Sequence, residues 1–192
     1  MMPRRDDLNS ILVLGSGPIK IGQAAEFDFS GSQAVRALRE DGYEVILVNS
    51  NPATIQNDPE MADRVYIEPL LPDTVRKILE IEKPDALLAG MGGQTALNIA
   101  SELSHDGTLE RLNVELIGSD LDAIDKAEDR ELFNQVCESI DLPISKAIAC
   151  NSMDEVINAA EQIGSWPILI RPAFTLGGLG GGTAFDLSLI HI

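Results

Sequence analysis

Cysteine is scarce in this chain of 192 residues, which contains only Cys137 and Cys150. Two cysteines cannot build a disulfide framework, so we expect two reduced thiols, as is typical of cytosolic proteins. Aromatic residues make up 4% of the sequence, so aliphatic side chains must supply most of the core. No apolar run reaches the ~18 residues of a membrane span, and none follows the N-terminal basic pair to make a signal peptide. These features predict a cytoplasmic protein with no membrane partner.

Positive charge is also scarce. The chain has 14 Lys and Arg against 31 Asp and Glu, which gives a formal net charge of −17 at pH 7. A surface of this sign repels nucleic-acid phosphates and anionic lipids, so neither is an expected partner. It does not exclude a nucleotide ligand, because a few local donors can hold a phosphate group.

Short aliphatic runs alternate with helical segments over about residues 8–120. Such strands, apolar along their whole length and joined by helices, predict an α/β fold with a parallel sheet covered on both faces. The expected strands are residues 11–14, 44–48, 64–67, 85–89 and 114–117, and the expected helices are residues 30–40, 73–82 and 94–103.

The last third of the sequence begins a second α/β domain that is too short to be complete. We expect helices at 119–126, 127–140 and 153–163, followed by a strand at 167–171. The final hexapeptide, residues 187–192, matches a reading frame of a common sequencing-library adapter. We therefore interpret it as a non-native tail.

Three polar loops follow strands of the first domain. Gly15, Gly17 and Gly22 follow the first strand with Gly-x-Gly-x4-Gly spacing, whereas the dinucleotide fingerprint needs Gly-x-Gly-x2-Gly and an acid after the second strand. The second strand here runs into the motif 49–54 (Asn-Ser-Asn-Pro-Ala-Thr), which fits either a ligand site or plain turn chemistry. The third loop is the motif 91–96, with two glycines before a helix. Together the loops predict one polar crevice at the sheet edge.

A further motif, near the end of the chain, carries the strongest signal for a phosphate ligand. Arg171 ends the last expected strand, and five glycines occur in the six residues 177–182. An arginine before a hairpin-like glycine loop is typical of a flexible lid over a triphosphate, since backbone N–H groups and a positive charge both face the phosphates. Arg130, in the charged run 124–130, is either a second phosphate clamp or part of a solvated face.

These motifs, in this order, resemble the N-terminal end of the large subunit in the carbamoyl-phosphate synthase family. The resemblance implies that residues 1–125 form a Rossmann-like pre-ATP-grasp domain and residues 126–186 the truncated start of an ATP-grasp domain. The matching segments are 15–23, 26–28, 48–55, 58–63, 91–98, 124–130 and 170–182.

The resemblance also implies an activity, that of an ATP-dependent ligase in arginine and pyrimidine biosynthesis. In this family ATP phosphorylates bicarbonate to carboxyphosphate, which ammonia from a small glutaminase subunit converts to carbamate; a second ATP gives carbamoyl phosphate. Arg130 and Arg171 match ATP-contacting arginines of the family, and Gly177 and Gly178 match the glycine loop. The ligands of the Mg²⁺ or Mn²⁺ ions lie in the remainder of the large subunit, so this chain alone is expected to be inactive, with no catalytic residue or metal ligand of its own.

Two alternatives remain beside this interpretation. One is another ATP-grasp ligase such as a biotin carboxylase relative, against which the motifs 49–54 and 92–95 argue. The other is a non-catalytic dinucleotide-binding module, against which the glycine spacing and the missing acid after the second strand argue.

Overall fold

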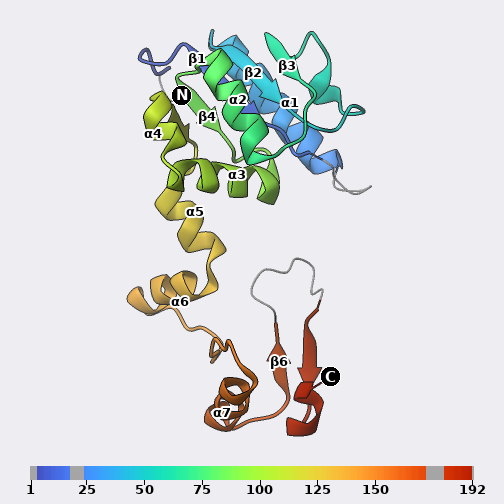
Figure 1. Cartoon of the computed structure of the whole chain (residues 1–192), viewed down its shortest axis with the longest axis vertical. Coiled ribbons are helices and arrows are strands. Elements are labelled where there is room, and N and C mark those ends of the chain that lie inside the picture. Colours follow the sequence, from blue (N-terminus) through green and yellow to red (C-terminus); the bar gives the residue numbers. More distant parts are fainter. Residues whose placement is uncertain (1–3, 18–23, 172–179, 192) are drawn as a thin grey trace. The chain divides into compact units, whose positions relative to one another are not determined.

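The computed structural model describes residues 4–17, 24–171 and 180–191 of the chain. It divides the chain into two compact units, Met1–Asp125 and Lys126–Ile192 (Figure 1). Among the described residues, no helix is long and apolar enough to cross a bilayer.

The first unit is built on a five-stranded sheet in the order β3-β2-β1-β4-β5, with every neighbouring pair parallel. This is the strand order of the first five strands of the Rossmann fold, so the expected α/β class is confirmed. All five expected strands are present. The strands are β1 (Ser10–Leu14), β2 (Glu44–Val48), β3 (Arg64–Tyr66), β4 (Ala86–Leu88) and β5 (Glu115–Ile117).

Alternate residues of the central strands supply two core layers, one on each face of the sheet. Leu12, Ile46 and Leu87 belong to the layer that contains α2 and α3, whereas Val13 and Leu47 belong to the layer that contains Val35 of α1. Burial on both faces explains why these strands are apolar throughout. The helical elements of this unit are α1 (Ala24–Glu40), η1 (Ile55–Asn57), α2 (Pro72–Glu82), α3 (Gly93–His105) and α4 (Thr108–Leu112).

The helix α1 begins six residues before the predicted start at residue 30. Ser30, Gly31 and Ser32 have low helix propensity, so they interrupt the helical pattern and separate residues 24–29 from the rest of α1. In the structure Ser30 Oγ donates a hydrogen bond back to the carbonyl oxygen of Glu26 at 2.9 Å, which makes a serine compatible with a helix interior. The short helices η1 and α4 were not predicted.

The second unit contains α6 (Arg130–Ser139), α7 (Met153–Ile163) and a two-stranded antiparallel sheet of β6 (Ile168–Ile170) and β7 (Gly182–Ala184). The helix α5 (Leu121–Glu128) crosses the division between the units, and a 3-10 helix, η2 (Leu187–His191), follows β7. The prediction of α7 is confirmed to the residue. Its N-cap is Ser152, whose side chain accepts from the N–H of Glu155, and its C-cap is Gly164 in the left-handed conformation.

Asp85 joins the amino ends of β1 and β4. Its carboxylate accepts the backbone N–H groups of Asn9 at 2.7 Å and Ser10 at 3.0 Å. These two hydrogen bonds stabilise the ionised form, so they lower the pKa of Asp85 below its usual value. The negative charge of Asp85 therefore stabilises the amino ends of the adjacent strands β1 and β4.

Replacing Asp85 with Asn should destabilise the protein by about 1 kcal/mol at pH 7, because the charge-assisted hydrogen bonds become neutral ones. The folded-state pKa lies below the unfolded one. The ionised Asp85 therefore makes its full contribution to the free energy of unfolding above about pH 4, and this contribution is lost as the pH falls through the folded-state pKa. Urea unfolding of both proteins between pH 7 and pH 2 would measure this. A stability difference that persists unchanged at the lowest pH would contradict it.

Candidate functional site

The structure brings the three polar loops together at the carboxyl edge of the sheet. Gly15, just after β1, donates its N–H to the carbonyl oxygen of Val48 at 2.8 Å. A Cβ atom on Gly15 would lie 2.5 Å from Asn49 Nδ2, and one on Gly92 would lie 2.5 Å from the carbonyl oxygen of Gly15. The loops after β1, β2 and β4 are therefore in direct contact.

Asn49 is completely buried at the end of β2, and both its amide nitrogen and its amide oxygen form hydrogen bonds. Its Nδ2 donates to Gln56 Oε1 at 3.1 Å, and its Oδ1 accepts the N–H of Asn51 at 3.0 Å. Gln56, also completely buried, donates its Nε2 to the carbonyl oxygen of Phe27 at 3.0 Å. The pair of amides thus links the end of β2 to η1 and α1, and the side chain of Asn49 is committed to the protein rather than to a ligand.

The rest of the motif 49–57 has the same structural role. Thr54 Oγ1 donates to Asp28 Oδ1 at 2.8 Å and accepts the N–H of Gln56 at 3.2 Å. Asn57 Nδ2 donates to the carbonyl oxygen of Asn51 at 2.7 Å. Of the two interpretations that the sequence left open for this motif, turn and network chemistry accounts for these side chains.

Gly92 and Gly93 are required for close packing. A Cβ atom on Gly92 would lie 2.7 Å from the carbonyl oxygen of Leu14. Gly93 has a φ of +65°, and a Cβ atom there would lie 2.9 Å from Phe27 Cε1. The start of α3 therefore lies directly on the end of β1.

Some buried polar atoms at this edge have no hydrogen-bond partner among the described residues. They include the hydroxyl groups of Ser16 and Ser50. A Cβ atom on Gly17 would lie 3.4 Å from Ser50 Oγ, which places Ser50 beside the loop after β1. Pro18, Lys20 and Gly22 of this loop lie outside the described residues.

The four residues predicted to contact ATP belong to the second unit. Arg171 is the one of them whose side chain the structure describes. Arg171 follows β6 directly and is exposed. Arg130 is the first residue of α6, where the structure describes the backbone only. Gly177 and Gly178 lie outside the described residues, between the two strands of the antiparallel sheet. Within residues 4–17, 24–171 and 180–191, no cluster of His, Cys, Asp and Glu could hold a metal ion.

The sequence interpretation missed Gln56 and Asp28. Neither stands in a recognisable phosphate or metal motif, and Gln56 sits in a segment with neither helix nor strand periodicity. The one hint in the sequence was that Gln56 follows a turn rich in Asn and Thr, whose side chains can hydrogen-bond to nearby backbone groups. That signal does not identify the distant partner in α1.

Two family models match consecutive parts of the chain. The model described as "Carbamoyl phosphate synthase preATP-grasp domain" covers residues 7–126, and "Carbamoyl-phosphate synthase L chain, ATP binding domain" covers residues 129–190. The chain belongs to the carbamoyl-phosphate synthase large-chain family.

Curated relatives agree with this membership. The chain is 60% identical over 185 residues to the carbamoyl phosphate synthase large chain of Nostoc sp., and 60% identical over 185 residues to that of Archaeoglobus fulgidus. Each alignment covers 96% of this chain and 17% of the relative. The chain therefore spans about a sixth of the length of these proteins.

Solved structures share the fold at much lower identity. The biotin carboxylase domain of the 2-oxoglutarate carboxylase from Hydrogenobacter thermophilus has a TM-score of 0.66 at 18% identity, covering 93% of this chain and 38% of that one. N5-carboxyaminoimidazole synthetase from Staphylococcus aureus has a TM-score of 0.60 at 13% identity, covering 95% and 43%. These likenesses concern the fold alone. The alternative of a biotin carboxylase relative is not favoured, because the large chains of carbamoyl-phosphate synthase are far more similar in sequence.

Replacing Gly92 with Ala should destabilise the protein by about 1–3 kcal/mol, since the new methyl group meets two backbone carbonyl oxygens that cannot move aside. Gly90→Ala is the matched control: it lies in the same loop, and a Cβ atom there meets nothing within 4 Å. Chemical unfolding followed by circular dichroism would compare them. Equal stability of the two variants would show that the close approach is not a constraint.

Replacing Gln56 with Ala should destabilise the protein by about 2–4 kcal/mol, because the buried Nδ2 of Asn49 loses its hydrogen-bond acceptor and the carbonyl oxygen of Phe27 loses one of its donors. Asn98→Ala, which removes an exposed amide hydrogen bond with Gln94, should cost less than about 0.5 kcal/mol. The same unfolding measurement serves for both. A small effect at Gln56 would mean that water or another group replaces its hydrogen bonds.

Proposed function

We propose that this chain is the N-terminal part of a carbamoyl-phosphate synthase large chain and works within an ATP-dependent ligase. The observation that carries the proposal is the 60% identity over 96% of the chain, together with two family models in consecutive order. In the proposed reaction ATP phosphorylates bicarbonate to carboxyphosphate, and ammonia displaces the phosphate to give carbamate. A second ATP then gives carbamoyl phosphate for arginine and pyrimidine biosynthesis.

In this proposal residues 1–125 are the pre-ATP-grasp domain and residues 126–186 begin the ATP-grasp domain. The partners are the remainder of the large chain and a small glutaminase subunit, in the cytoplasm. ATP is the nucleotide, with Mg²⁺ or Mn²⁺ held by residues of the remainder. One structural neighbour was solved with MgADP.

The chemistry of the second unit supports a phosphate-binding role. The antiparallel pairing of Ile168 with Ala184 and of Ile170 with Gly182 makes β6 and β7 the two arms of a hairpin, and Arg171 stands at the exit of the first arm. Phosphoryl transfer to bicarbonate needs positioning and charge neutralisation more than a protein nucleophile. An exposed arginine beside a glycine-rich connection supplies a positive charge and backbone N–H donors.

Replacing Arg171 with Ala in the full-length large chain should lower bicarbonate-dependent ATP hydrolysis about 10- to 100-fold, since each charge-assisted contact to phosphate contributes about 1.5–3 kcal/mol. Arg36→Ala, which removes one exposed positive charge from α1, should leave the rate within about twofold of the wild type. Steady-state kinetics with and without bicarbonate would measure both. Unchanged kinetics in the Arg171 variant would remove this residue from the nucleotide site.

A further inference from the structure

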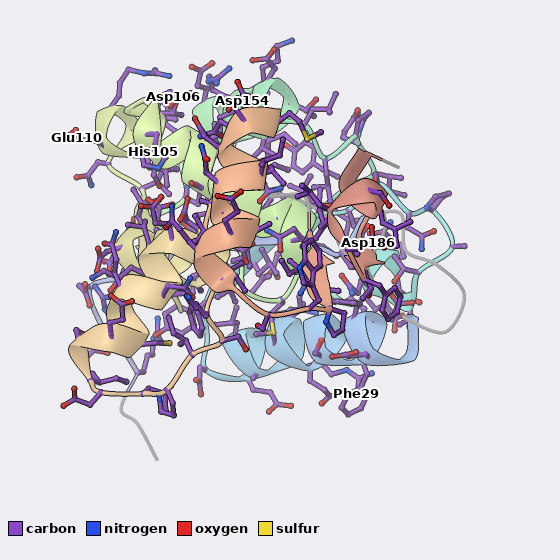
Figure 2. The ribbon with its side chains drawn as sticks, turned by 90° about the horizontal axis from the view of Figure 1, so that it is seen from below. Phe29, His105, Asp106, Glu110, Asp154 and Asp186 are labelled. Carbon is purple, nitrogen blue, oxygen red and sulfur yellow. The ribbon has the colours of Figure 1, made fainter. Side chains whose placement is uncertain are left out.

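One carboxylate joins α5 to the first unit. Ser101 Oγ donates to Asp125 Oδ1 at 3.2 Å, and His105 Nε2 lies 3.2 Å from Asp125 Oδ2. Ser101 and His105 are four residues apart on α3 and therefore stand on the same side of that helix, one turn from each other. Figure 2 labels His105 at the end of α3. We call these three residues the α3–α5 clasp.

The clasp lies beside a buried apolar side chain, that of Ile124. Ile124, the residue before Asp125, is 5% exposed, whereas the Asp125 and His105 side chains are 32% and 61% exposed. Burial of the isoleucine supplies most of the attachment energy, because ion pairs this exposed contribute little to stability. The clasp therefore has a directional effect: it determines how α5 leaves the first unit.

The helix α5 ends soon after the clasp. The helix α5 ends at Glu128 and α6 starts at Arg130, so only Asp129 lies between the two helices. Asp129 is extended, with φ −83° and ψ 119°, and its carboxylate accepts the N–H groups of Glu131 at 2.8 Å and Leu132 at 3.0 Å. Two helices joined at one non-helical residue form a natural hinge, since a small change in its φ and ψ rotates one against the other.

We propose that Ser101, His105 and Asp125 are positioning residues, which hold α5 against α3 so that α6 turns only at Asp129, directly before Arg130. The inference rests on the proposed function, in which Arg130 contacts ATP. With the clasp intact, the start of α6 is already restricted when the nucleotide arrives. Without it, part of the binding free energy is spent on ordering α5, and the apparent affinity for ATP falls.

The kinetic test uses the full-length large chain with its partner subunit. Asp125→Ala should raise the KM for ATP in bicarbonate-dependent hydrolysis about three- to tenfold, with kcat within about twofold of the wild type. Asp125→Asn, which keeps an acceptor for Ser101, should restore part of this affinity. Glu102→Ala is the matched control, because it removes one exposed negative charge from α3 beside the clasp and should leave KM unchanged.

Amide hydrogen exchange without nucleotide gives a second, function-independent measurement. Asp125→Ala should speed exchange of the α5 amides, and Glu102→Ala should not. Unchanged exchange in α5 overturns the proposal, and so does faster exchange with an unchanged KM, which would make the clasp merely structural. If the wild-type protein itself shows no bicarbonate-dependent ATP hydrolysis, the proposed function fails, and the role in ATP binding fails with it. A wild-type protein without this activity is thus distinguished from an active wild type whose Asp125→Ala variant shows no change.

Discussion

The packing of the first unit requires glycine where β1 ends, because no side chain fits between the loops there. The backbone of Gly92 lies against the carbonyl oxygens of Leu14 and Gly15, and Gly15 in turn lies against the side chain of Asn49. This contact allows the loops after β1, β2 and β4 to meet. Beneath it the amides of Asn49 and Gln56 are buried, and among the described residues they bond to each other and to nearby backbone groups. Protein interiors are packed too densely to admit even one methyl group at such a contact without rearrangement.

That constraint explains how a Rossmann strand order occurs here without a dinucleotide-binding fingerprint. In dinucleotide-binding proteins the glycines after β1 bring the backbone close to a pyrophosphate. Here Gly15 and Gly92 bring it close to other parts of the same sheet edge. Glycine serves both purposes for the same physical reason, so its presence after a strand indicates a close approach without saying what approaches.

Much of the fold was predictable, because the strands and long helices carry their own signals. Apolar strands buried on both faces predicted the parallel sheet, and the helix expected at 153–163 is α7. Residues 24–29 of α1 were missed because Ser30, Gly31 and Ser32, which have low helix propensity, separate them from the apolar pattern of residues 34–38. The polar network was not predictable, since Gln56 is fixed by Asn49 and by the backbone of Phe27, twenty-nine residues away along the chain. Long-range hydrogen bonds of this kind leave no periodic pattern in the sequence.

The distribution of charge bears on where a nucleotide binds. Most arginines of the first unit form ion pairs: Arg5 with Asp7 and Glu115, Arg39 with Asp63, Arg64 with Glu44 and Glu82, Arg76 with Asp73 and Asp106, and Arg111 with Glu80. A phosphate that competed for one of them would have to displace a carboxylate and then face the repulsion of a chain with a net charge of −17. The cost of that exchange favours the second unit, where Arg171 is exposed at the end of β6, as the part that supplies positive charge to ATP.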